Sequence, residues 1–403
     1  MKLLFFDLPQ LHQQLLPLTY TRPIAALRIG IHTIEEKWKH YFTDAEVGYA
    51  TQHYLQKKWK LLADSTNALA INGSLCPTKE LVQVCKNLQP GQALVYNNMV
   101  VAAKLKADLP ESFEPEGFEV VTANQEPRLI TNPWHIFQYN GEQIRADFNR
   151  ITEGKTSAGI ADPYTIAYNS ANIFVEKGAK IKAAILNAED GPIYIGKDAQ
   201  IHEGSIIKGP FALCEGSHVN PGGKMRGDTT VGPHSKVGGE ISNSVIQGYS
   251  NKGHEGFLGN SVLGEWCNLG ADTNNSNLKN NYAPVKLWSY ARNGFANTGL
   301  QFCGLIMGDH SKCGINTMFN TGTVVGVSAN IFGSGFPRNF VPSFSWGGAS
   351  GFTTYAIKTA FQVAQRVMER RNINLEEEDQ EILQHIFDVT SEYRVWEKTT
   401  ESN

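Results

Sequence analysis

The chain has no excess of charge of either sign, because 36 basic residues stand against 39 acidic ones and the net charge is −3. This balance gives no electrostatic reason to expect nucleic acid or an anionic membrane as a partner. Long hydrophobic runs are also missing: the mean hydropathy is −0.29, and no apolar stretch approaches the roughly 18 residues of a membrane-spanning helix. The composition therefore predicts a soluble protein that binds neither nucleic acid nor membrane.

Cysteine is sparse, and its spacing is uninformative for metal binding. The six cysteines include no C-x-x-C pair, which favours buried thiols in a reducing compartment over a disulfide or zinc framework. The apolar run of the N-terminal segment 1–7 is too short for a signal peptide, because it ends at the acidic residue Asp7. We expect this segment to be a first β-strand. Together these features predict a cytoplasmic location.

Glycine, by contrast, is concentrated: 29 of the 38 glycines lie between residues 171 and 350. This region has a six-residue repeat in which the first position is aliphatic or Met and the fifth is mostly small. The first positions of eight consecutive repeats are Ile195, Ile201, Ile207, Leu213, Val219, Met225, Val231 and Val237. Such hexapeptide repeats predict a left-handed parallel β-helix with triangular coils of three hexads, in which residues 18 apart stack.

Two segments interrupt the repeat, residues 243–256 and 275–306, and we expect both to be loops ejected from the solenoid, where functional residues usually lie. The flat faces of such a prism commonly pack against other copies, which predicts a homotrimer.

The flanking regions follow other patterns. In residues 1–165, the apolar runs Lys2–Phe6, Ala93–Ala103 and Phe118–Val121 alternate with helical patterns at Thr33–Phe42 and Lys79–Leu88, which predicts an α/β domain with a parallel or mixed sheet. Beyond the solenoid, two amphipathic helices are expected. The predicted domains are an α/β domain at 1–165, a β-helix at 166–350 and a C-terminal helical segment at 351–403, with the helices at Tyr355–Arg371 and Leu375–Trp396.

Several motifs in the solenoid occur in a fixed order. They are Val237-Gly-Gly-Glu240, Asn251-Lys-Gly-His254, Cys267-Asn268-Leu-Gly-Ala271 and Asn277. Their order and spacing resemble the acetyltransferase half of the bifunctional glucosamine-1-phosphate N-acetyltransferase/N-acetylglucosamine-1-phosphate uridyltransferase family, GlmU. The resemblance is closest to a GlmU-like branch of Bacteroidetes, in which it extends along most of the chain, including the Pro-Leu-Thr-x-Thr-Arg-Pro segment at 17–23.

The resemblance implies acetyl-CoA-dependent N-acetylation of an amino sugar phosphate. His254 would be the general base that takes a proton from the sugar amine as it attacks the thioester, and Glu240 would orient or stabilise its imidazole. Without the flanking motifs, a histidine in a polar loop would more simply be a solvated surface residue. The binding residues expected by this resemblance are Asn268, Lys252 and Lys286 for the sugar phosphate, and Ala271, Asn277, Lys279 and Arg292 for acetyl-CoA.

The chain also departs from the family pattern. Phe257 replaces a tyrosine and Ser242 replaces a lysine, both of which help to bind the sugar phosphate in the family, and Asp272 replaces a glycine. The acceptor could therefore be an amino sugar phosphate other than glucosamine 1-phosphate. Cations of the 275–306 segment could take over a phosphate or simply solvate that loop; these are Lys279, Lys286 and Arg292.

The same resemblance makes the N-terminal domain a nucleotidyltransferase-like fold that would use an NTP, expected to be UTP, with Mg²⁺. The glycine-rich phosphate loop of that family is missing, which leaves Arg22 and Arg28 to meet a triphosphate. Asp147 is the first candidate for a Mg²⁺ ligand and Asp7 the second. Structural roles compete, because Arg22 could pair with a core carboxylate and Asp147 could cap a turn.

Two other functions fit parts of the pattern. A γ-type carbonic anhydrase would need zinc-binding histidines, and His202, His218 and His234 recur every 16 residues, but an 18-residue coil puts them at different positions. A trimeric scaffold that binds or senses a nucleotide sugar without catalysis agrees with the missing phosphate loop. The motif that contains His254 argues against such a scaffold for the solenoid.

Overall fold

In the computed structural model of the chain, residues 1–123 and 125–397 are described. The chain forms two compact units. The N-terminal unit comprises Met1–Leu15, Thr21–Leu27 and His32–Asn132. The β-helix unit comprises Leu16–Tyr20, Arg28–Ile31 and Pro133–Asn403.

The N-terminal unit is built on a mixed six-stranded sheet of order β2-β1-β3-β5-β4-β6. β1 pairs in parallel with β2 and β3, whereas β5 runs antiparallel to β3 and β4. The runs at Lys2–Phe6 and Phe118–Val121 correspond to β1 and β6, whereas the run at Ala93–Ala103 is a hairpin of two strands, β4 and β5. The strands are β1 (Lys2–Phe6), β2 (Glu46–Ala50), β3 (Leu69–Asn72), β4 (Gln92–Tyr96), β5 (Met99–Lys104) and β6 (Glu119–Thr122).

The two helices predicted in this unit are also confirmed, as α2 (Ile34–Tyr41) and α3 (Lys79–Asn87). A capping box starts α2: the Thr33 hydroxyl accepts from the Glu36 N–H at 3.2 Å, and the Glu36 carboxylate accepts from the Thr33 N–H at 2.7 Å. The remaining helical segments are α1 (Pro9–Gln14), η1 (Ile24–Ala26), η2 (His53–Leu55) and η3 (Pro115–Gly117).

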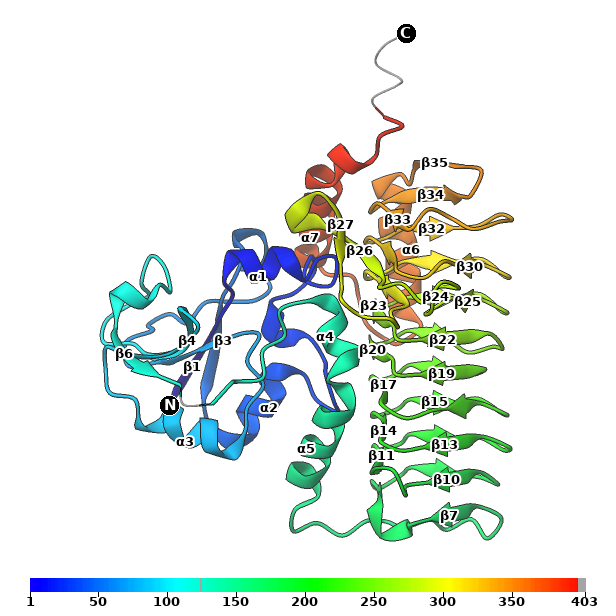
Figure 1. Cartoon of the computed structure of the whole chain (residues 1–403), viewed down its shortest axis with the longest axis horizontal. Helices are drawn as coiled ribbons and strands as arrows, with labels where there is room; N and C mark the ends of the chain where they lie inside the picture. The colour runs from blue at the N-terminus through cyan, green and yellow to red at the C-terminus, as the bar shows by residue number, and fades with distance from the viewer. Residues whose placement is uncertain (124, 398–403) are drawn as a thin grey trace. The chain divides into compact units, whose positions relative to one another are not determined.

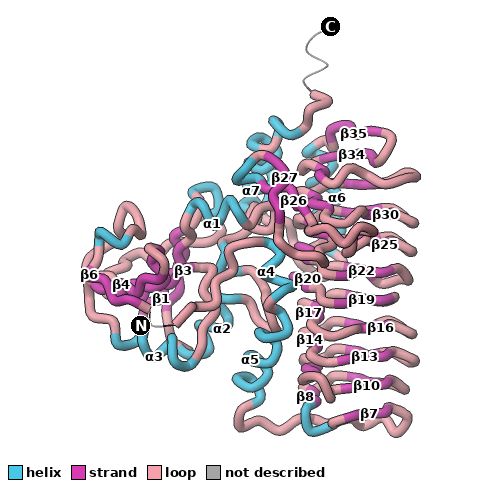
Figure 2. Tube along the Cα trace, in the orientation of Figure 1, coloured by secondary structure: helices cyan, strands magenta, loops and turns pink. Residues whose placement is uncertain are grey.

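The second unit contains the predicted parallel β-helix, whose short strands stack coil upon coil (Figures 1 and 2). Three sheets form its three faces. The first sheet contains β7 (Ile166–Tyr168), β10 (Ile185–Asn187), β13 (Ile206–Lys208), β16 (Lys224–Met225), β19 (Glu240–Ser242) and β22 (Phe257–Gly259). The second contains β8 (Ile173–Val175), β11 (Ile193–Ile195), β14 (Phe211–Leu213), β17 (Thr229–Val231), β20 (Val245–Gly248), β23 (Val262–Glu265), β28 (Leu305–Met307), β31 (Thr323–Val325) and β33 (Phe340–Val341).

The third sheet matters most for function and is called the pocket face below. It contains β9 (Lys180–Ile181), β12 (Gln200–Ile201), β15 (His218–Val219), β18 (Lys236–Val237), β21 (Asn251–Lys252), β24 (Asn268–Leu269), β29 (Lys312–Cys313), β32 (Asn330–Ile331), β34 (Ser345–Gly348) and β35 (Gly351–Thr354). Its strands are parallel except β35, which pairs antiparallel with β34. One further parallel pair joins β25 (Asn274–Asn275) to β30 (Met318–Phe319).

The hexad pattern has a direct structural basis. The aliphatic first residues form one continuous buried core inside the prism. Small fifth residues lie at the corners, where serine hydroxyls bond to the next coil: Ser217 Oγ accepts from the Ser235 N–H at 3.2 Å, and Ser311 Oγ accepts from the Ala329 N–H at 3.0 Å. A larger side chain would fill the space through which these bonds pass.

The coil length equals the predicted period of 18 in part of the solenoid, for example from β14 to β17 and from β28 to β31, and it departs from that period in the other coils. Ile193 pairs with Phe211, a spacing of 18, whereas Val237 pairs with Lys252, a spacing of only 15. The expectation that residues 243–256 form an ejected loop is wrong. They form β20 and β21 in a shortened coil, in which Ile246 keeps the inward-facing position between Val231 and Leu263 although the corners lose residues.

The second interruption is an insertion, as predicted. Leu263 pairs with Met307, so the coil resumes after a long excursion. Within the excursion, β26 (Lys286–Ser289) and β27 (Gly294–Asn297) form an antiparallel hairpin around η5 (Tyr290–Arg292).

Two helices before the solenoid pack with it. α5 (Asn140–Thr152) contributes Ile144, Phe148 and Ile151 to a buried cluster with Phe174 and Ala212, and it follows α4 (Pro133–Gln138). Residues 133–152 thus belong to the β-helix unit, although the sequence pattern groups them with the α/β region.

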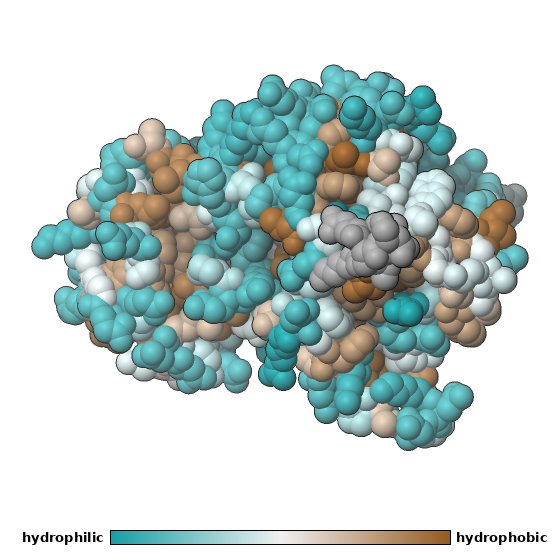
Figure 3. Space-filling model, turned by 90° about the horizontal axis from the view of Figure 1, so that it is seen from above, coloured by the Kyte–Doolittle hydropathy of each residue, from teal (hydrophilic) through white to brown (hydrophobic). Residues whose placement is uncertain are grey.

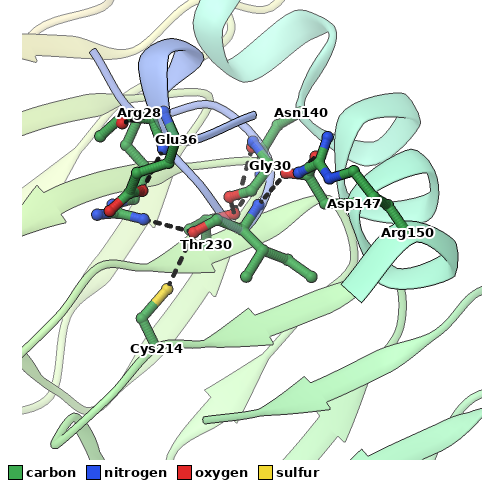
Figure 4. A network of polar contacts seen from close by, with 10 residues as sticks. Arg28, Gly30, Glu36, Asn140, Asp147, Arg150, Cys214 and Thr230 are labelled. Atoms are coloured by element: carbon green, nitrogen blue, oxygen red, sulfur yellow. Dashed lines mark hydrogen bonds and ion pairs between the residues drawn. The ribbon is translucent and has the colours of Figure 1, made fainter. Parts of the chain in front are cut away.

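The segment Arg28–Ile31 is held against α5 and β17 by a polar network (Figure 4). Asn140 Oδ1 accepts from the Gly30 N–H at 2.7 Å, and Thr230 Oγ1 donates to the Gly30 carbonyl at 2.8 Å. Gly30 has φ +72°, and a Cβ there would lie 2.5 Å from Asp147 Oδ2. Only glycine fits this position without displacing the network.

The chain ends in the two expected helices, α6 (Ile357–Glu369) and α7 (Glu377–Val389), followed by η6 (Ser391–Tyr393). The fully buried residues of α6 are Ala360, Ala364 and Met368. Val363 and Val367 are only partly buried, because they border a cavity.

The face seen in Figure 3 is mostly hydrophilic, with smaller hydrophobic areas between. Among the described residues, no helix combines the length and apolarity needed to cross a membrane.

Candidate functional site

A cavity of about 850 Å³ lies between the pocket face and α6. This volume is within the range of small-molecule sites. The β-helix contributes most of its wall, and α6 contributes Val363, Val367 and the two arginines that follow, Arg370 and Arg371. The β-helix residues are Asn220, Lys236, Tyr249, Asn251, Gly253, His254, Trp266, Cys267, Asn268, Leu269, Gly270, Ala271, Lys312 and Ile315.

Three of the residues singled out by the motifs meet in this cavity: His254, Asn268 and Ala271. His254 follows β21 at a corner of the prism, where its imidazole is exposed and can reach a bound molecule. Asn268 projects outward from β24 in the next coil, and its Oδ1 accepts from Asn251 Nδ2 at 3.5 Å. The cavity therefore places a possible proton acceptor beside amide groups that can bind sugar hydroxyls.

The corner that carries His254 is fixed from both sides. On the outer side, Asn220 Nδ2 donates to the Gly253 carbonyl at 2.7 Å. On the inner side, Lys252 Nζ donates to the carbonyls of His254 at 2.6 Å and Glu255 at 3.1 Å. Lys252, predicted to bind substrate, thus lies inside the prism and not in the cavity, and burial lowers its pKa to about 8.

Glu240 lies away from the cavity-lining residues. Its strand β19 pairs with β22 and places Glu240 beside Phe257. Its carboxylate forms an ion pair with Arg226 Nη1 at 3.1 Å. The structure thus pairs Glu240 with an arginine, and the orienting role for the imidazole stays a prediction.

Four cations border the cavity, and the motifs did not reveal them: Lys236, Lys312, Arg370 and Arg371. Among the described residues that line it, none is an aspartate or glutamate. Lys312 donates to the His310 carbonyl at 2.7 Å, and burial lowers its pKa to about 8. Arg371 Nη2 donates to the His234 carbonyl at 3.4 Å. The cavity is therefore suited to an anionic ligand.

The cations expected in the insertion occupy other places. Lys279 Nζ donates to the Pro284 carbonyl at 3.1 Å, within the insertion itself. Lys286 on β26 and Arg292 in η5 are exposed, and neither lines the cavity. Asn277 Nδ2 donates to Asn260 Oδ1 at 2.8 Å, also outside the cavity lining.

In the N-terminal unit, Asp7 follows β1 and is partly buried. Its carboxylate accepts from the Ile24 N–H at 3.1 Å and from Thr51 Oγ1 at 2.6 Å. Burial raises the pKa of Asp7 to about 7, against the lowering effect of these two hydrogen bonds. Arg22 of the same unit is buried, and its Nε donates to Thr21 Oγ1 at 3.4 Å.

Asp147 and Arg28 belong to the β-helix unit. Asp147 Oδ1 pairs with Arg150 at 2.7 Å, and Oδ2 accepts from the Ile31 N–H at 2.8 Å, so both oxygens are engaged (Figure 4). Arg28 is buried, and its Nε donates to the Gln247 carbonyl at 3.1 Å. These contacts fit structural roles for both residues.

Of the two alternative candidates for a Mg²⁺ ligand, Asp147 has one oxygen paired with Arg150 and the other bonded to the Ile31 N–H, whereas Asp7 accepts from Ile24 and Thr51. A Mg²⁺ site at either carboxylate stays a prediction. Within residues 1–123 and 125–397, no group of three His, Cys, Asp or Glu side chains is placed to hold a metal ion. The three histidines considered for zinc do not form one cluster. His202 and His218 contact each other, whereas the ring of His234 stacks on Tyr249.

The raised pKa of Asp7 predicts how the stability of the N-terminal unit depends on pH. Between about pH 4 and 7 the unfolded carboxyl is ionised while the folded one keeps its proton, so the free energy of unfolding falls as pH rises, by at most about 4 kcal/mol. Asp7→Asn removes this effect. We expect the variant to gain stability over wild type at pH 8 and to lose that gain towards pH 4, as measured by urea unfolding.

The matched control is Asp44→Asn, an exposed position of the same unit, which should change stability little at either pH. A difference between Asp7→Asn and wild type that is constant from pH 4 to 8 would contradict the burial of an ionisable carboxyl.

The N-terminal region of the chain is similar to a known protein family. Residues 3–156 match the sugar nucleotidyl transferase family. The chain is 31% identical over 205 residues to the bifunctional sugar-1-phosphate nucleotidylyltransferase/acetyltransferase of Sulfurisphaera tokodaii, a match that covers 50% of the chain and 44% of the relative. It is 31% identical over 118 residues to the bifunctional protein GlmU of Methanocaldococcus jannaschii, covering 29% and 26%.

The chain thus spans less than half the length of either relative. Among solved structures, a hexapeptide transferase family protein from Anaplasma phagocytophilum matches at 16% identity and a TM-score of 0.21, over 51% of this chain and 92% of that one. A mutant of AntD, an N-acyltransferase from Bacillus cereus in complex with dTDP and coenzyme A, matches at 12% identity and a TM-score of 0.22, over 51% and 91%. The β-helix itself is established by the strand pairing.

Proposed function

We propose that the β-helix unit transfers the acetyl group of acetyl-CoA to the amine of an amino sugar phosphate, as a step of nucleotide-sugar synthesis of the UDP-N-acetylglucosamine type. The observation that carries this proposal is the cavity that brings His254, Asn268 and Ala271 together beside four cations. The relatives named as nucleotidylyltransferase/acetyltransferase and GlmU support the same reaction class.

In this reaction His254 acts as the general base. Its imidazole accepts a proton from the amine while the N–C bond to the thioester carbonyl forms. The C–S bond then breaks, the CoA sulfur leaves as a thiolate, and the proton on His254 returns to that sulfur. The exposed corner suits this role because the imidazole is accessible to a molecule bound in the cavity.

The four cations of the cavity bind the phosphates of acetyl-CoA. Arg370 and Arg371 present guanidinium groups, which suit phosphate oxygens because they can donate two hydrogen bonds in one plane. Lys236 and Lys312 add charge on the pocket face. This assignment replaces the insertion cations Lys279 and Arg292 as the main contacts, while Asn268 and Ala271 keep their predicted places beside the sugar and the acetyl group.

For the N-terminal unit, the match to sugar nucleotidyl transferases supports nucleotidyl transfer from an NTP such as UTP, with Arg22 near the phosphates. A second candidate is binding of a nucleotide sugar without catalysis. It is favoured by the absence of the glycine-rich phosphate loop at 7–12 and by the pairing of Asp147 with Arg150. Release of pyrophosphate from a panel of NTPs and sugar 1-phosphates distinguishes the two.

The acetyl transfer is tested with purified protein, acetyl-CoA and a panel of amino sugar 1-phosphates, by following the free CoA thiol. We expect turnover with at least one amino sugar phosphate and none with the matching N-acetylated compound. An absence of turnover across the whole panel would refute the proposal and leave the scaffold alternative.

We further propose a homotrimer. Ile166, Ile185 and Ile206 stack in register on the outer side of one sheet, and each is at least 36% exposed. Such an apolar row is typical of a surface that packs against another copy. Sedimentation equilibrium should give the mass of three chains, and a monomer mass at micromolar concentration would exclude this assembly.

A further inference from the structure

The pocket face of the β-helix has one polar residue in an otherwise apolar interior column. The inward-facing residues of its parallel strands are Ile181, Ile201, Val219, Val237, Leu269, Cys313 and Ile331, with Lys252 between Val237 and Leu269. Lys252 is only 1% exposed. An ammonium group in this column is costly unless its three N–H donors find acceptors.

The acceptors come from an unusually tight corner of the shortened coil. Only Gly238 and Gly239 separate β18 from β19, whereas four residues, 253–256, separate β21 from β22 in the next coil. A Cβ on Gly239 would lie 2.8 Å from the His254 carbonyl oxygen and 2.6 Å from that of Gly256. The 253–256 corner therefore rests directly on two glycines, and its carbonyls converge there.

Lys252 Nζ donates to three of the converging carbonyls, those of His254 at 2.6 Å, Glu255 at 3.1 Å and Gly238 at 3.4 Å. The ammonium thus ties the corner that bears His254 to the preceding coil. Because the three donors are used in this way, Lys252 does not need a substrate to satisfy its charge.

We infer that Lys252 is a positioning residue, which fixes the backbone of His254 from inside the prism and so sets where the imidazole meets the acceptor amine. This inference rests on the proposed acetyl transfer. A displacement of about 1 Å at a reacting group can cost about 100-fold in rate. Loss of the hydrogen bonds from Lys252 to this corner is therefore expected to lower the rate of acetyl transfer.

The test compares Lys252→Met, which keeps length and volume but removes the donors, with the control Val219→Ala, which removes packing from the same column two coils away. We expect Lys252→Met to lower kcat by about 10-fold or more while KM for acetyl-CoA changes less than about twofold, because the phosphate-binding cations are untouched. Val219→Ala should leave both constants close to wild type.

Two further measurements separate positioning from general destabilisation. In a His254→Ala background, adding Lys252→Met should cost nothing more, since the lysine acts through the histidine. Amide hydrogen exchange of residues 253–256 should be faster in Lys252→Met than in wild type or Val219→Ala, at temperatures where all three are folded.

The outcomes are distinct. Unchanged kcat in folded Lys252→Met, or an equal loss in the His254→Ala background, would overturn the positioning role. If Lys252→Met fails to fold, Asn220→Ala removes the outer anchor of the same corner, and it should give the same drop in kcat and faster exchange. If wild type shows no acetyl transfer, the proposed function fails, and the exchange experiment alone decides whether Lys252 orders the corner.

Discussion

Replacing His254 with alanine should lower kcat for acetyl transfer by about 10²- to 10⁴-fold, the range expected when a general base is removed. The imidazole lines the cavity, whereas its backbone is held by Asn220 and Lys252, so the substitution removes the base without releasing the corner. Initial rates of CoA release measure the effect. KM for acetyl-CoA should stay within about threefold of wild type, because its phosphates are bound elsewhere.

The control is His202→Ala, which removes an imidazole from the same face, outside the cavity lining, and should leave turnover unchanged. The pH profile adds a second criterion. The acidic limb of kcat/KM in wild type should disappear in His254→Ala. A variant that keeps more than a tenth of the wild-type kcat and the same acidic limb would assign the proton transfer to another group.

The second large effect is expected at the end of α6. Replacing Arg370 and Arg371 together with alanine should raise KM for acetyl-CoA by about 100-fold, since a hydrogen bond to a charged group contributes about 1.5–3 kcal/mol. kcat at saturating acetyl-CoA should change little. Because charge dominates the contact, wild-type KM should rise with ionic strength, and the double variant should have lost most of this dependence.

Arg366→Ala is the matched control, because Arg366 is an exposed arginine of α6 that does not line the cavity. It should leave KM unchanged. If the double variant and the control have the same KM for acetyl-CoA, the phosphates of acetyl-CoA do not bind at the end of α6. The insertion cations Lys279, Lys286 and Arg292 are then the next group to test.

The six-residue period predicted most of the second unit because it reflects a strict geometric demand: one aliphatic residue inward on each side of the prism, and a small residue at each corner. The pattern failed at 243–256 because the coil there is shorter than 18 residues, so that the inward-facing Ile246 and Lys252 fall out of the hexad frame. The apolar pair Val245-Ile246 was the available sequence signal for β20. β21 was harder to predict, because a lysine stands at the inward position where the pattern requires an aliphatic residue.

The candidate site was only partly predictable. His254, Asn268 and Ala271 lie in consecutive coils, so local spacing brings them to the same wall. Arg370 and Arg371 are about a hundred residues further along the chain, and their place depends on how α6 packs, which no local pattern encodes. A pair of arginines at the end of an amphipathic helix was the one available signal. Asp7 and Asp147, in turn, belong to separate units.

The long excursion between β25 and β28 leaves and rejoins the prism at almost the same point. The Cys303 N–H donates to the Asn277 carbonyl at 2.9 Å, and the Gly304 N–H donates to that of Asn260 at 2.8 Å, so a short bridge already closes its base. The stem therefore limits the entropic cost of lengthening the exposed segment 280–282 beyond it. The hairpin that follows is anchored a second time, because Trp288 stacks on Phe340 and Tyr290 packs against Tyr393, so its length is fixed by contacts outside the excursion.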